Sequence, residues 1–222
     1  MHTHTYITHH GYDYTISVLY HHHIISHLCV CICNVTGHNS ARERHLEISA
    51  KSALNAKETQ VVDNCFFSGY SEVVKATSES QNGTSIKAQV SVKGPTQPHS
   101  RQFEICMESL KPLLQKNLNS FCMSVYDGEC SMDGFYQPKL PSGRNGHFIA
   151  SAMYKYPWYF LQMPDTSTIM EFKKRAKVMC AMSYEDVSAY STNLDTSVKK
   201  DTILQYNCFF ISYISVLLER KW

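Results

Sequence analysis

Two cysteines that flank a short turn place the strongest constraint on the fold of this chain. Cys122 and Cys130 enclose seven residues, among them the pair Asp127-Gly128. Because Asp and Gly both favour tight turns, the two thiols are expected to lie close together. In the chain-entropy view, a disulfide closing such a loop stabilises the fold by roughly 2–3 kcal/mol. We therefore predict a disulfide here, the alternative being two unrelated buried thiols.

The cysteines as a whole fall into two groups. Cys29, Cys31 and Cys33 alternate near the N-terminus, and the other six of the nine are spread through the body of the chain. Those six are Cys65, Cys106, Cys122, Cys130, Cys180 and Cys208. They form no CxxC pair and no Cys/His zinc spacing. An even set at wide spacing is typical of an oxidising compartment, although spacing does not fix which cysteines pair. Sequons at Asn34 and Asn82 are compatible with glycosylation in that compartment.

Composition supports a folded core and excludes one class of partner. Hydrophobic residues make up 43% of the 222 residues and charged residues 18%, which suits one domain or two small ones rather than a disordered chain. The net charge is +2, and the Lys and Arg residues are dispersed. Nucleic-acid binding requires a basic surface field that this sequence does not supply, so we expect no nucleic-acid partner.

Residues 1–35 differ in character from the rest. Eight of the twelve histidines lie within residues 1–27, but no helical histidine pair with a carboxylate partner organises them into a metal site. The apolar part, residues 14–35, lacks the basic start and the small-residue cleavage site of a signal peptide, and its histidines disfavour a membrane span. We interpret residues 1–35 as an atypical segment, disordered or mispredicted. A membrane tether there is the less favoured alternative.

Hydrophobic patterns further along the chain predict an α/β fold. Residues 86–93 alternate between apolar and polar, as in a half-buried strand, and Asn82-Gly83 just before them favours a hairpin. Apolar residues spaced by three to four predict a helix over residues 100–118. The apolar stretch 202–218 predicts a helix buried in the core. Helices packed on a sheet are therefore expected.

Capping residues predict where other helices begin. The stretch GHNSARERHLEISAKSAL, residues 37–54, is predicted to be helical. Thr166 or Ser167 is expected to cap a further helix. Ser183 is expected to cap a short one with acidic residues in its first turn.

The segment after the cysteine loop carries a distinctive order of motifs. GFYQPKL is followed by a glycine-containing gap and then by GHFIASAMYKYPWYFL, which places six aromatic residues between positions 148 and 160. This order resembles the C-terminal lobe of the ecto-nucleoside triphosphate diphosphohydrolases, the apyrases. That family has a Cys-loop-Cys, an Asn-Gly-x-Phe-x-Pro-Pro pattern and an aromatic run that leads into a helix. The chain departs from it at Asp133, Lys139 and Ser151, which replace an Asn, a Pro and an aromatic residue.

The resemblance covers about residues 36–222 and implies a partial actin-like or RNase H-like lobe, with helices on a mixed sheet. The stretch DNCFFSGY at residues 63–70 agrees with an Asn-Pro-Cys segment of the family. The resemblance also implies three disulfides: Cys65–Cys106, Cys122–Cys130 and Cys180–Cys208. It places the protein in the secretory pathway, extracellular or membrane-attached.

The resemblance also implies a ligand and a residue that binds it. Family members remove terminal phosphates from nucleoside di- and triphosphates, using Ca²⁺ or Mg²⁺. Tyr156 matches the aromatic residue of the family that stacks on the nucleotide base, a role that suits a flat phenol ring. The alternative for Tyr156 is a core aromatic residue on an amphipathic helix.

The phosphate chemistry of the family has no counterpart in this sequence. The family carries two glycine-rich phosphate loops, Asp-x-Gly-Ser-Ser-Gly-Thr and Asp-Leu-Gly-Gly-Ala-Ser, with a glutamate between them as general base. Neither loop occurs here, and SGRNG at residues 142–146 lacks the aspartate. We therefore predict a nucleoside phosphatase relative with no catalytic residue and no metal held by this chain, inactive alone. A disulfide-stapled secreted binding module without catalysis is the alternative.

Overall fold

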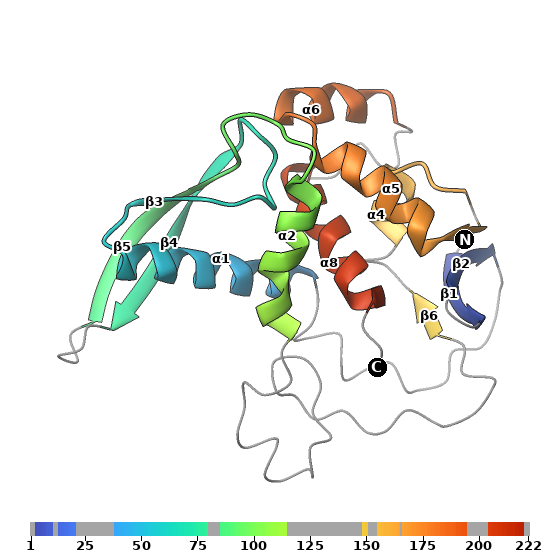
Figure 1. Ribbon diagram of the computed structural model, residues 1–222, viewed down its shortest axis with the longest axis horizontal. Helices are drawn as coiled ribbons and strands as arrows, with labels where there is room; N and C mark the ends of the chain where they lie inside the picture. Colours follow the sequence, from blue (N-terminus) through green and yellow to red (C-terminus); the bar gives the residue numbers. More distant parts are fainter. Residues whose placement is uncertain are drawn as a thin grey trace, which may run out of the picture.

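The computed structural model of the protein describes residues 3–10, 13–20, 38–79, 85–114, 148–150, 155–164, 166–194 and 204–219. Its strands are β1 (Thr3–His10), β2 (Asp13–Tyr20), β3 (Gln60–Val62), β4 (Ser71–Glu79), β5 (Ser85–Lys93), β6 (Phe148–Ala150) and β7 (Thr166–Thr168). Its α-helices are α1 (His38–Asn55), α2 (Gln102–Leu110), α4 (Lys155–Phe160), α5 (Ile169–Cys180), α6 (Tyr184–Thr192) and α8 (Asn207–Glu219), with 3-10 turns η1 (Lys111–Leu114) and η5 (Leu204–Tyr206). Figure 1 shows β3, β4 and β5 beside α1 at one end, and α2, α5 and α8 gathered at the centre.

The β3-β5-β4 sheet is mixed, because β5 pairs antiparallel with β4 and parallel with β3. Along β5, buried Val90 and Val92 alternate with exposed Lys87 and Gln89. This alternation and the β4–β5 hairpin confirm the strand predicted over residues 86–93. The predicted fold class, α/β with helices on a mixed sheet, is also the one observed.

Helix α1 covers one face of this sheet through small side chains. Ala50 and Ala53 of α1 are buried against Ala76 of β4 and Val90 of β5. Because alanine carries a single side-chain carbon, the helix can approach the sheet closely without leaving voids. The helix predicted over residues 37–54 is therefore confirmed, and its buried side is the one that faces the sheet.

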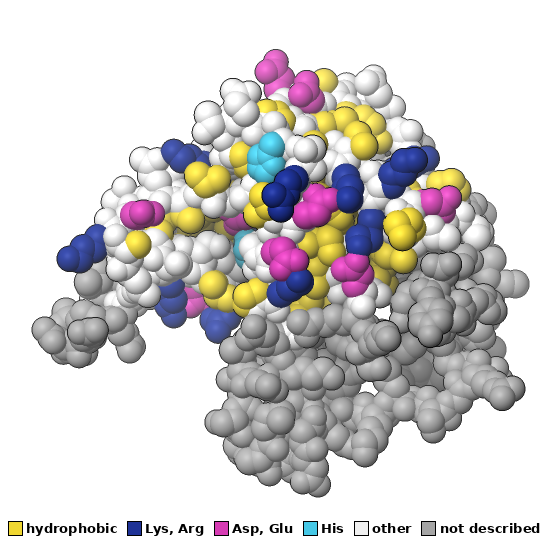
Figure 2. All heavy atoms as spheres, in the orientation of Figure 1, with side chains coloured by type: hydrophobic (Ala, Val, Ile, Leu, Met, Phe, Trp, Pro, Cys, Tyr) yellow, Lys and Arg dark blue, Asp and Glu magenta, His cyan; other side chains and the backbone are white. Residues whose placement is uncertain are grey.

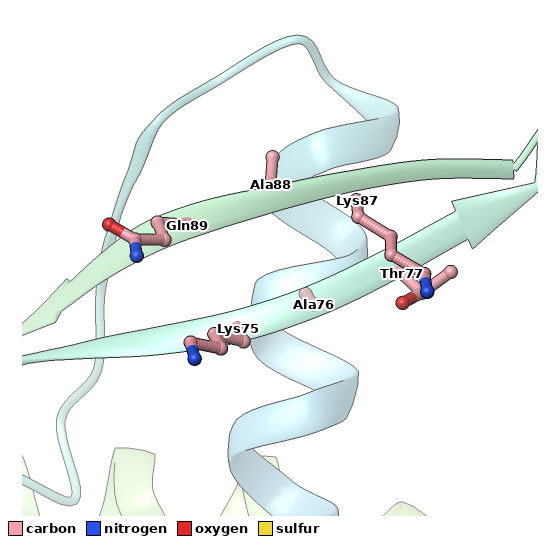
Figure 3. A pocket seen from close by; sticks show the side chains of 6 residues that line it. All are labelled: Lys75, Ala76, Thr77, Lys87, Ala88 and Gln89. Atoms are coloured by element: carbon pink, nitrogen blue, oxygen red, sulfur yellow. The ribbon is translucent and has the colours of Figure 1, made fainter.

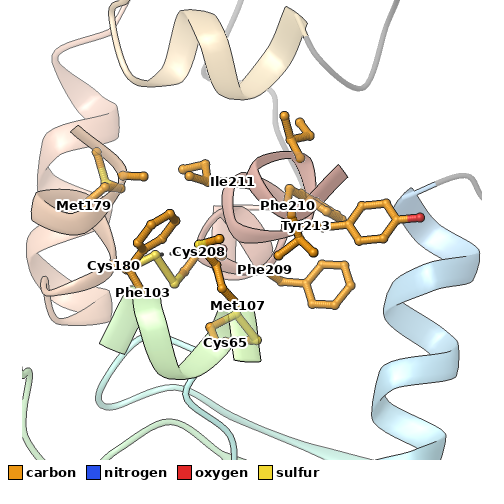
Figure 4. Close-up of a cluster of buried hydrophobic side chains, with 14 of the residues drawn as sticks. Cys65, Phe103, Met107, Met179, Cys180, Cys208, Phe209, Phe210, Ile211 and Tyr213 are labelled. Atoms are coloured by element: carbon orange, nitrogen blue, oxygen red, sulfur yellow. Dashed lines mark hydrogen bonds between the residues drawn. A yellow bond between two sulfur atoms is a disulfide. The ribbon is translucent and has the colours of Figure 1, made fainter. Parts of the chain in front are cut away.

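The largest core lies where α2, α5 and α8 meet (Figure 4). Helix α8 is buried from Asn207 to Leu218. Phe209 stacks on Tyr213 with 5.9 Å between ring centroids and meets Phe210 edge to face at 5.6 Å. A helix that is apolar all round belongs inside a core, so the predicted buried final helix is confirmed. Among the described residues, no helix combines the length and apolar character needed to cross a membrane.

Capping boxes fix the starts of α5 and α6. The Thr168 hydroxyl accepts a hydrogen bond from the Glu171 backbone N–H at 3.2 Å, and the Glu171 carboxylate accepts one from the Thr168 backbone N–H at 2.7 Å. Ser183 and Asp186 make the same reciprocal pair at α6, so the predicted cap at Ser183 is confirmed. Helix α5 is capped by Thr168 and not by either of the two preceding residues, because only Thr168 has a glutamate three positions later.

Strands β1 and β2 form an antiparallel hairpin within the first 35 residues. Strand β6 extends this sheet beside β1, and β7 extends it beside β2. These two strands lie within the segment that we interpreted as atypical, disordered or mispredicted, and that interpretation of residues 1–35 stays a prediction. Both strands are rich in Thr, Tyr, Ile and Val, which favour strands, and their outer partners come from distant parts of the chain. Residues 21–35 lie outside the described part of the protein.

Ion pairs tie the helical cluster together at its surface. Lys177 of α5 lies 2.5 Å from Glu104 of α2, and Lys173 of α5 pairs with Glu219 of α8. Figure 2 shows basic and acidic side chains beside one another on this face, with hydrophobic surface between them. The three central helices are therefore joined both through their core and across their exposed edges.

Candidate functional site

Tyr156, the residue expected to stack on a base, lies on the short helix α4. Its side chain is 48% exposed, which sets it apart from its neighbours on the same helix, the buried Trp158 and Phe160. A core aromatic residue would be buried, whereas an exposed ring can present a flat face to a planar ligand. The exposure of Tyr156 thus favours a ligand-facing position, and its base-stacking role stays a prediction.

Helix α4 is held in place by its other aromatic residues. Trp158 stacks on Phe172 of α5 with 5.6 Å between ring centroids, and its indole N–H donates to the Pro164 carbonyl at 3.0 Å. Phe160 packs edge to face on Tyr190, whose hydroxyl donates to the Phe160 carbonyl at 2.9 Å. These contacts fix the helix on the protein, so Tyr156 is presented from a rigid support.

Two disulfides join elements around the helical cluster. Cys65–Cys106 links the segment after β3 to α2, with 4.8 Å between the Cα atoms. Cys180–Cys208 links α5 to α8, with 5.1 Å between the Cα atoms. Both are pairs that the resemblance implied. Three predicted site residues lie outside the described part of the chain: Cys122, Cys130 and Asn82.

A buried histidine–carboxylate pair lies beside the first disulfide. His45 of α1 and Asp63, which follows β3, are each 4% exposed, and His45 Nε2 lies 2.7 Å from Asp63 Oδ2. The second carboxylate oxygen of Asp63 accepts a hydrogen bond from the Cys65 backbone N–H at 2.8 Å. Sequence reasoning missed this pair because its members stand 18 positions apart and belong to no local motif.

Donor atoms of His45, Asp63 and Cys65 lie within 4.8 Å of one another, the one such group of potential metal ligands among the described residues. The group contains a single carboxylate, whereas Ca²⁺ and Mg²⁺ are bound through several oxygen ligands. The described residues therefore do not fit the Ca²⁺ or Mg²⁺ implied for the complete family enzyme. The Cys65 sulfur is bonded to Cys106 and has no thiolate to offer in this state.

A second polar cluster joins α1, β4 and η5. The hydroxyls of Tyr206 and Tyr70 both donate to Glu72 Oε2, at 2.6 Å and 3.2 Å, and the Arg42 guanidinium lies 4.2 Å from the centre of the Tyr206 ring. Burial, reinforced by Tyr206 and Glu72, raises the pKa of Tyr70. Burial together with Glu72 raises the pKa of Tyr206 as well. Both phenols therefore stay protonated at neutral pH and act as hydrogen-bond donors to Glu72, so neither tyrosine is a general base.

A shallow hollow of about 270 Å³ lies over the β4–β5 hairpin (Figure 3). It is lined by Lys75, Ala76, Thr77, Lys87, Ala88 and Gln89. The lining contains neither an aromatic ring that could hold a base nor a carboxylate that could hold a metal. Its two lysines are exposed, so the hollow offers a weakly positive surface and no catalytic group.

The class of this protein is an α/β lobe of the partial actin-like kind. It combines the mixed sheet under α1 with a disulfide-bonded helical cluster and an exposed aromatic residue on α4. The model of the GDA1/CD39 (nucleoside phosphatase) family matches residues 7–221. Since the match spans nearly the whole chain, the protein belongs to the GDA1/CD39 nucleoside phosphatase family. This membership confirms the resemblance to the apyrases seen in the sequence. No curated protein gives a significant match to the chain.

Proposed function

We propose that this protein binds nucleoside di- and triphosphates as part of a nucleoside phosphatase, with Tyr156 stacking on the base. The observation that carries the proposal is the match of residues 7–221 to a nucleoside phosphatase family. The exposed ring of Tyr156, on a helix fixed by Trp158 and Phe160, supports the stacking role. Every base has a π-face, so such a platform accepts different bases without reading their edges.

We also propose that the 222-residue chain does not hydrolyse nucleotides alone. In-line attack of water on a terminal phosphate requires a positioned base, a metal held by carboxylates and a cradle of hydrogen-bond donors. Neither phosphate loop of the family occurs in the sequence, and the described residues offer no ligand set for Ca²⁺ or Mg²⁺. The metal of the complete enzyme would be held by groups other than these.

A second candidate function is a secreted binding module without catalysis. The disulfides Cys65–Cys106 and Cys180–Cys208 favour it, because such bonds form and persist in oxidising compartments. The same observation supports a place in the secretory pathway, extracellular or membrane-attached. The two candidates differ in whether a nucleotide is the ligand.

Replacing Tyr156 tests the base-stacking role. Base stacking contributes on the order of 1–3 kcal/mol, which alone corresponds to a dissociation constant weaker than millimolar. Saturation-transfer NMR with ATP or ADP suits such weak binding. We expect transfer from the protein to the base protons in the unmodified chain, its loss in Tyr156→Ala and its retention in Tyr156→Phe, which keeps the ring. Equal transfer in the unmodified chain and in Tyr156→Ala would show that the base lies elsewhere.

Phosphate release tests the second proposal. We expect no release from ATP or ADP by the purified chain with Ca²⁺ or Mg²⁺ above that of a mock preparation. Turnover that copurifies with the chain would contradict it and would assign catalysis to residues that the family does not use. Absence of both binding and turnover would favour the binding module for another ligand.

A further inference from the structure

The buried group beside the Cys65–Cys106 disulfide has the composition of a zinc site whose two sulfur ligands are joined to each other by oxidation. His45 supplies an imidazole nitrogen, Asp63 a carboxylate oxygen and Cys65 a sulfur, and the three side chains are buried. Nitrogen and sulfur donors of this kind select Zn²⁺ over Ca²⁺ or Mg²⁺. The residues come from α1, from the segment after β3 and, through the disulfide, from α2, so they join three elements of the fold.

We propose that reduction of the Cys65–Cys106 disulfide turns this group into a Zn²⁺ site with His45, Asp63, Cys65 and Cys106 as ligands. A dithiol reductant supplies two electrons and two protons. The S–S bond breaks, each cysteine gains a thiol proton, and the reductant closes its own disulfide. Zinc then binds both sulfurs as thiolates and releases the two thiol protons to solvent.

The distances suit a tetrahedral ion after small shifts. Zinc bonds of about 2.0 Å to N or O and about 2.3 Å to S place neighbouring ligand atoms about 3.3–3.8 Å apart. The donor atoms of His45, Asp63 and Cys65 already lie within 4.8 Å of one another. The contact of His45 Nε2 with Asp63 Oδ2, now 2.7 Å, must open by about 0.6 Å to reach that geometry. Cys106 needs to move only far enough from Cys65 for the two sulfurs to flank the ion.

The surroundings already orient the ligands. Asp63 Oδ1 accepts a hydrogen bond from the Cys65 backbone N–H at 2.8 Å, which fixes the carboxylate and leaves Oδ2 to face the group. The Ser109 hydroxyl lies 3.5 Å from Cys65 Sγ and donates to the Cys106 carbonyl at 2.7 Å. Hydrogen bonds of this kind hold metal ligands in place and tune their basicity.

The second disulfide provides an internal control. The sulfur atoms of Cys180 and Cys208 lie near the Ser212 hydroxyl and the Asn64 carbonyl, at 4.0 Å and 3.9 Å. Within the described residues, no histidine or carboxylate joins these sulfurs in a group of potential ligands. Reduction of this second bond therefore creates two thiols without the nitrogen and oxygen donors, and it should create no zinc site.

Cobalt substitution tests the proposal in the full-length chain. Co²⁺ replaces Zn²⁺ and reports thiolate ligands through a near-ultraviolet charge-transfer band and tetrahedral geometry through strong visible bands. The N-terminal cysteines are removed by Cys29→Ser, Cys31→Ser and Cys33→Ser, so that the histidine-rich start of the chain cannot form a thiolate site. All further variants are made in this background, and each is measured before and after reduction by dithiothreitol.

We expect the reduced chain to bind one equivalent of Co²⁺ and to show both the charge-transfer band and the tetrahedral bands. Zn²⁺ should displace the Co²⁺ and remove these bands. The oxidised chain should show neither set of bands. His45→Gln and Asp63→Asn should each abolish the tetrahedral bands. The control with Cys180→Ser and Cys208→Ser should keep them.

Far-ultraviolet circular dichroism at saturating metal shows whether the reduced chain is folded. A folded reduced chain without the bands overturns the proposal. So does a band that is unchanged in both His45→Gln and Asp63→Asn, since the thiolates would then belong to another site. A chain that unfolds on reduction and is not refolded by Zn²⁺ also contradicts it, because a site that holds three elements must couple binding to folding.

Discussion

The helical cluster around α8 and the contact between α1 and the β3-β5-β4 sheet differ in the kind of side chain that they bury. The cluster buries large aromatic residues, among them Phe103, Phe172, Phe209 and Tyr213. The contact of α1 with the sheet has one cluster of small residues, Ala50, Ala53, Ala76 and Val90, and a second small cluster of Leu46, Phe66 and Val92. Since hydrophobic stabilisation grows with the apolar area removed from water, a buried aromatic residue of the cluster contributes more than a buried alanine of the α1–sheet contact.

The two regions also differ in what covers and cross-links them. Val62 and Val73, on the sheet face away from α1, are 52% and 64% exposed. Both disulfides in the described part of the chain reach the helical cluster, and neither lies within the β4–β5 hairpin. Regions with few buried apolar contacts open at lower free energy than a protein's core. The hairpin is therefore expected to exchange its amide protons before α5 and α8 do.

The largest expected effect compares two buried phenylalanines, one in each region. Phe209 lies inside the helical cluster, whereas Phe66 packs with Leu46 and Val92 and meets the half-buried Tyr70 edge to face. Phenylalanine-to-alanine changes in cores cost about 3–5 kcal/mol, and the cost rises with the cavity that remains. We expect Phe209→Ala to fall near the upper end and Phe66→Ala near the lower, because Tyr70 can move into the space.

Urea unfolding under non-reducing conditions measures both changes. Met170→Ala, on the exposed face of α5, is the matched control and should stay within about 0.5 kcal/mol of the unmodified chain. A larger loss for Phe66→Ala than for Phe209→Ala would reverse the comparison and place the more rigid packing on the sheet side.

The next effect in size concerns the disulfide inside the cluster. Cys180 and Cys208 stand 28 positions apart, for which loop-closure entropy gives about 3.5 kcal/mol of stabilisation. Replacing both by alanine should lower the free energy of unfolding by about that amount. Hydrogen exchange should show the loss of protection mainly in α5 and α8. Loss confined to β4 and β5 would mean that the bond stabilises the hairpin instead.

Much of the fold could be predicted from the sequence because its signals are local. The alternation of apolar and polar residues over 86–93 and the apolar character of residues 202–218 depend only on neighbouring positions. The predicted strand and the predicted buried helix are both confirmed. The hairpin of β1 and β2 was not foreseen. Its outer partners, β6 and β7, come from positions more than a hundred residues away, which no short pattern reveals.

The site was less predictable than the fold. Tyr156 was identified through the family resemblance, and its exposure could not be read from a run of six aromatic residues. The pair His45–Asp63 and the bond from Tyr206 to Glu72 join positions 18 and 134 apart. Polar pairs of this kind arise from the packing of α1 and η5 on the sheet, so sequence patterns do not report them.

The smallest expected effect on stability concerns two carboxylates, Glu104 in the helical cluster and Glu47 on α1. Partial burial raises the pKa of Glu104, but the hydrogen bond from Lys177 and a backbone N–H outweigh burial and lower it overall. The hydrogen bond from Arg44 lowers the pKa of Glu47, with a further contribution from Lys51. Glu104 connects α2 to α5, whereas both of these partners of Glu47 lie on α1 itself.

A carboxylate whose pKa is lowered by folding contributes stability above its unfolded pKa, about 4.3, and loses it as the pH falls through the folded value. Glu104 and Glu47 are 38% and 43% exposed, so solvent screening limits each contribution to a few tenths of a kcal/mol. Glu104→Gln and Glu47→Gln should therefore both flatten the fall in the free energy of unfolding between about pH 5 and pH 3. Only Glu104→Gln should also speed amide exchange at the contact of α2 with α5. Two results would show that the ion pair between the two helices does not help to hold the cluster together. One is faster amide exchange at this contact in Glu47→Gln, and the other is an unchanged exchange rate there in Glu104→Gln.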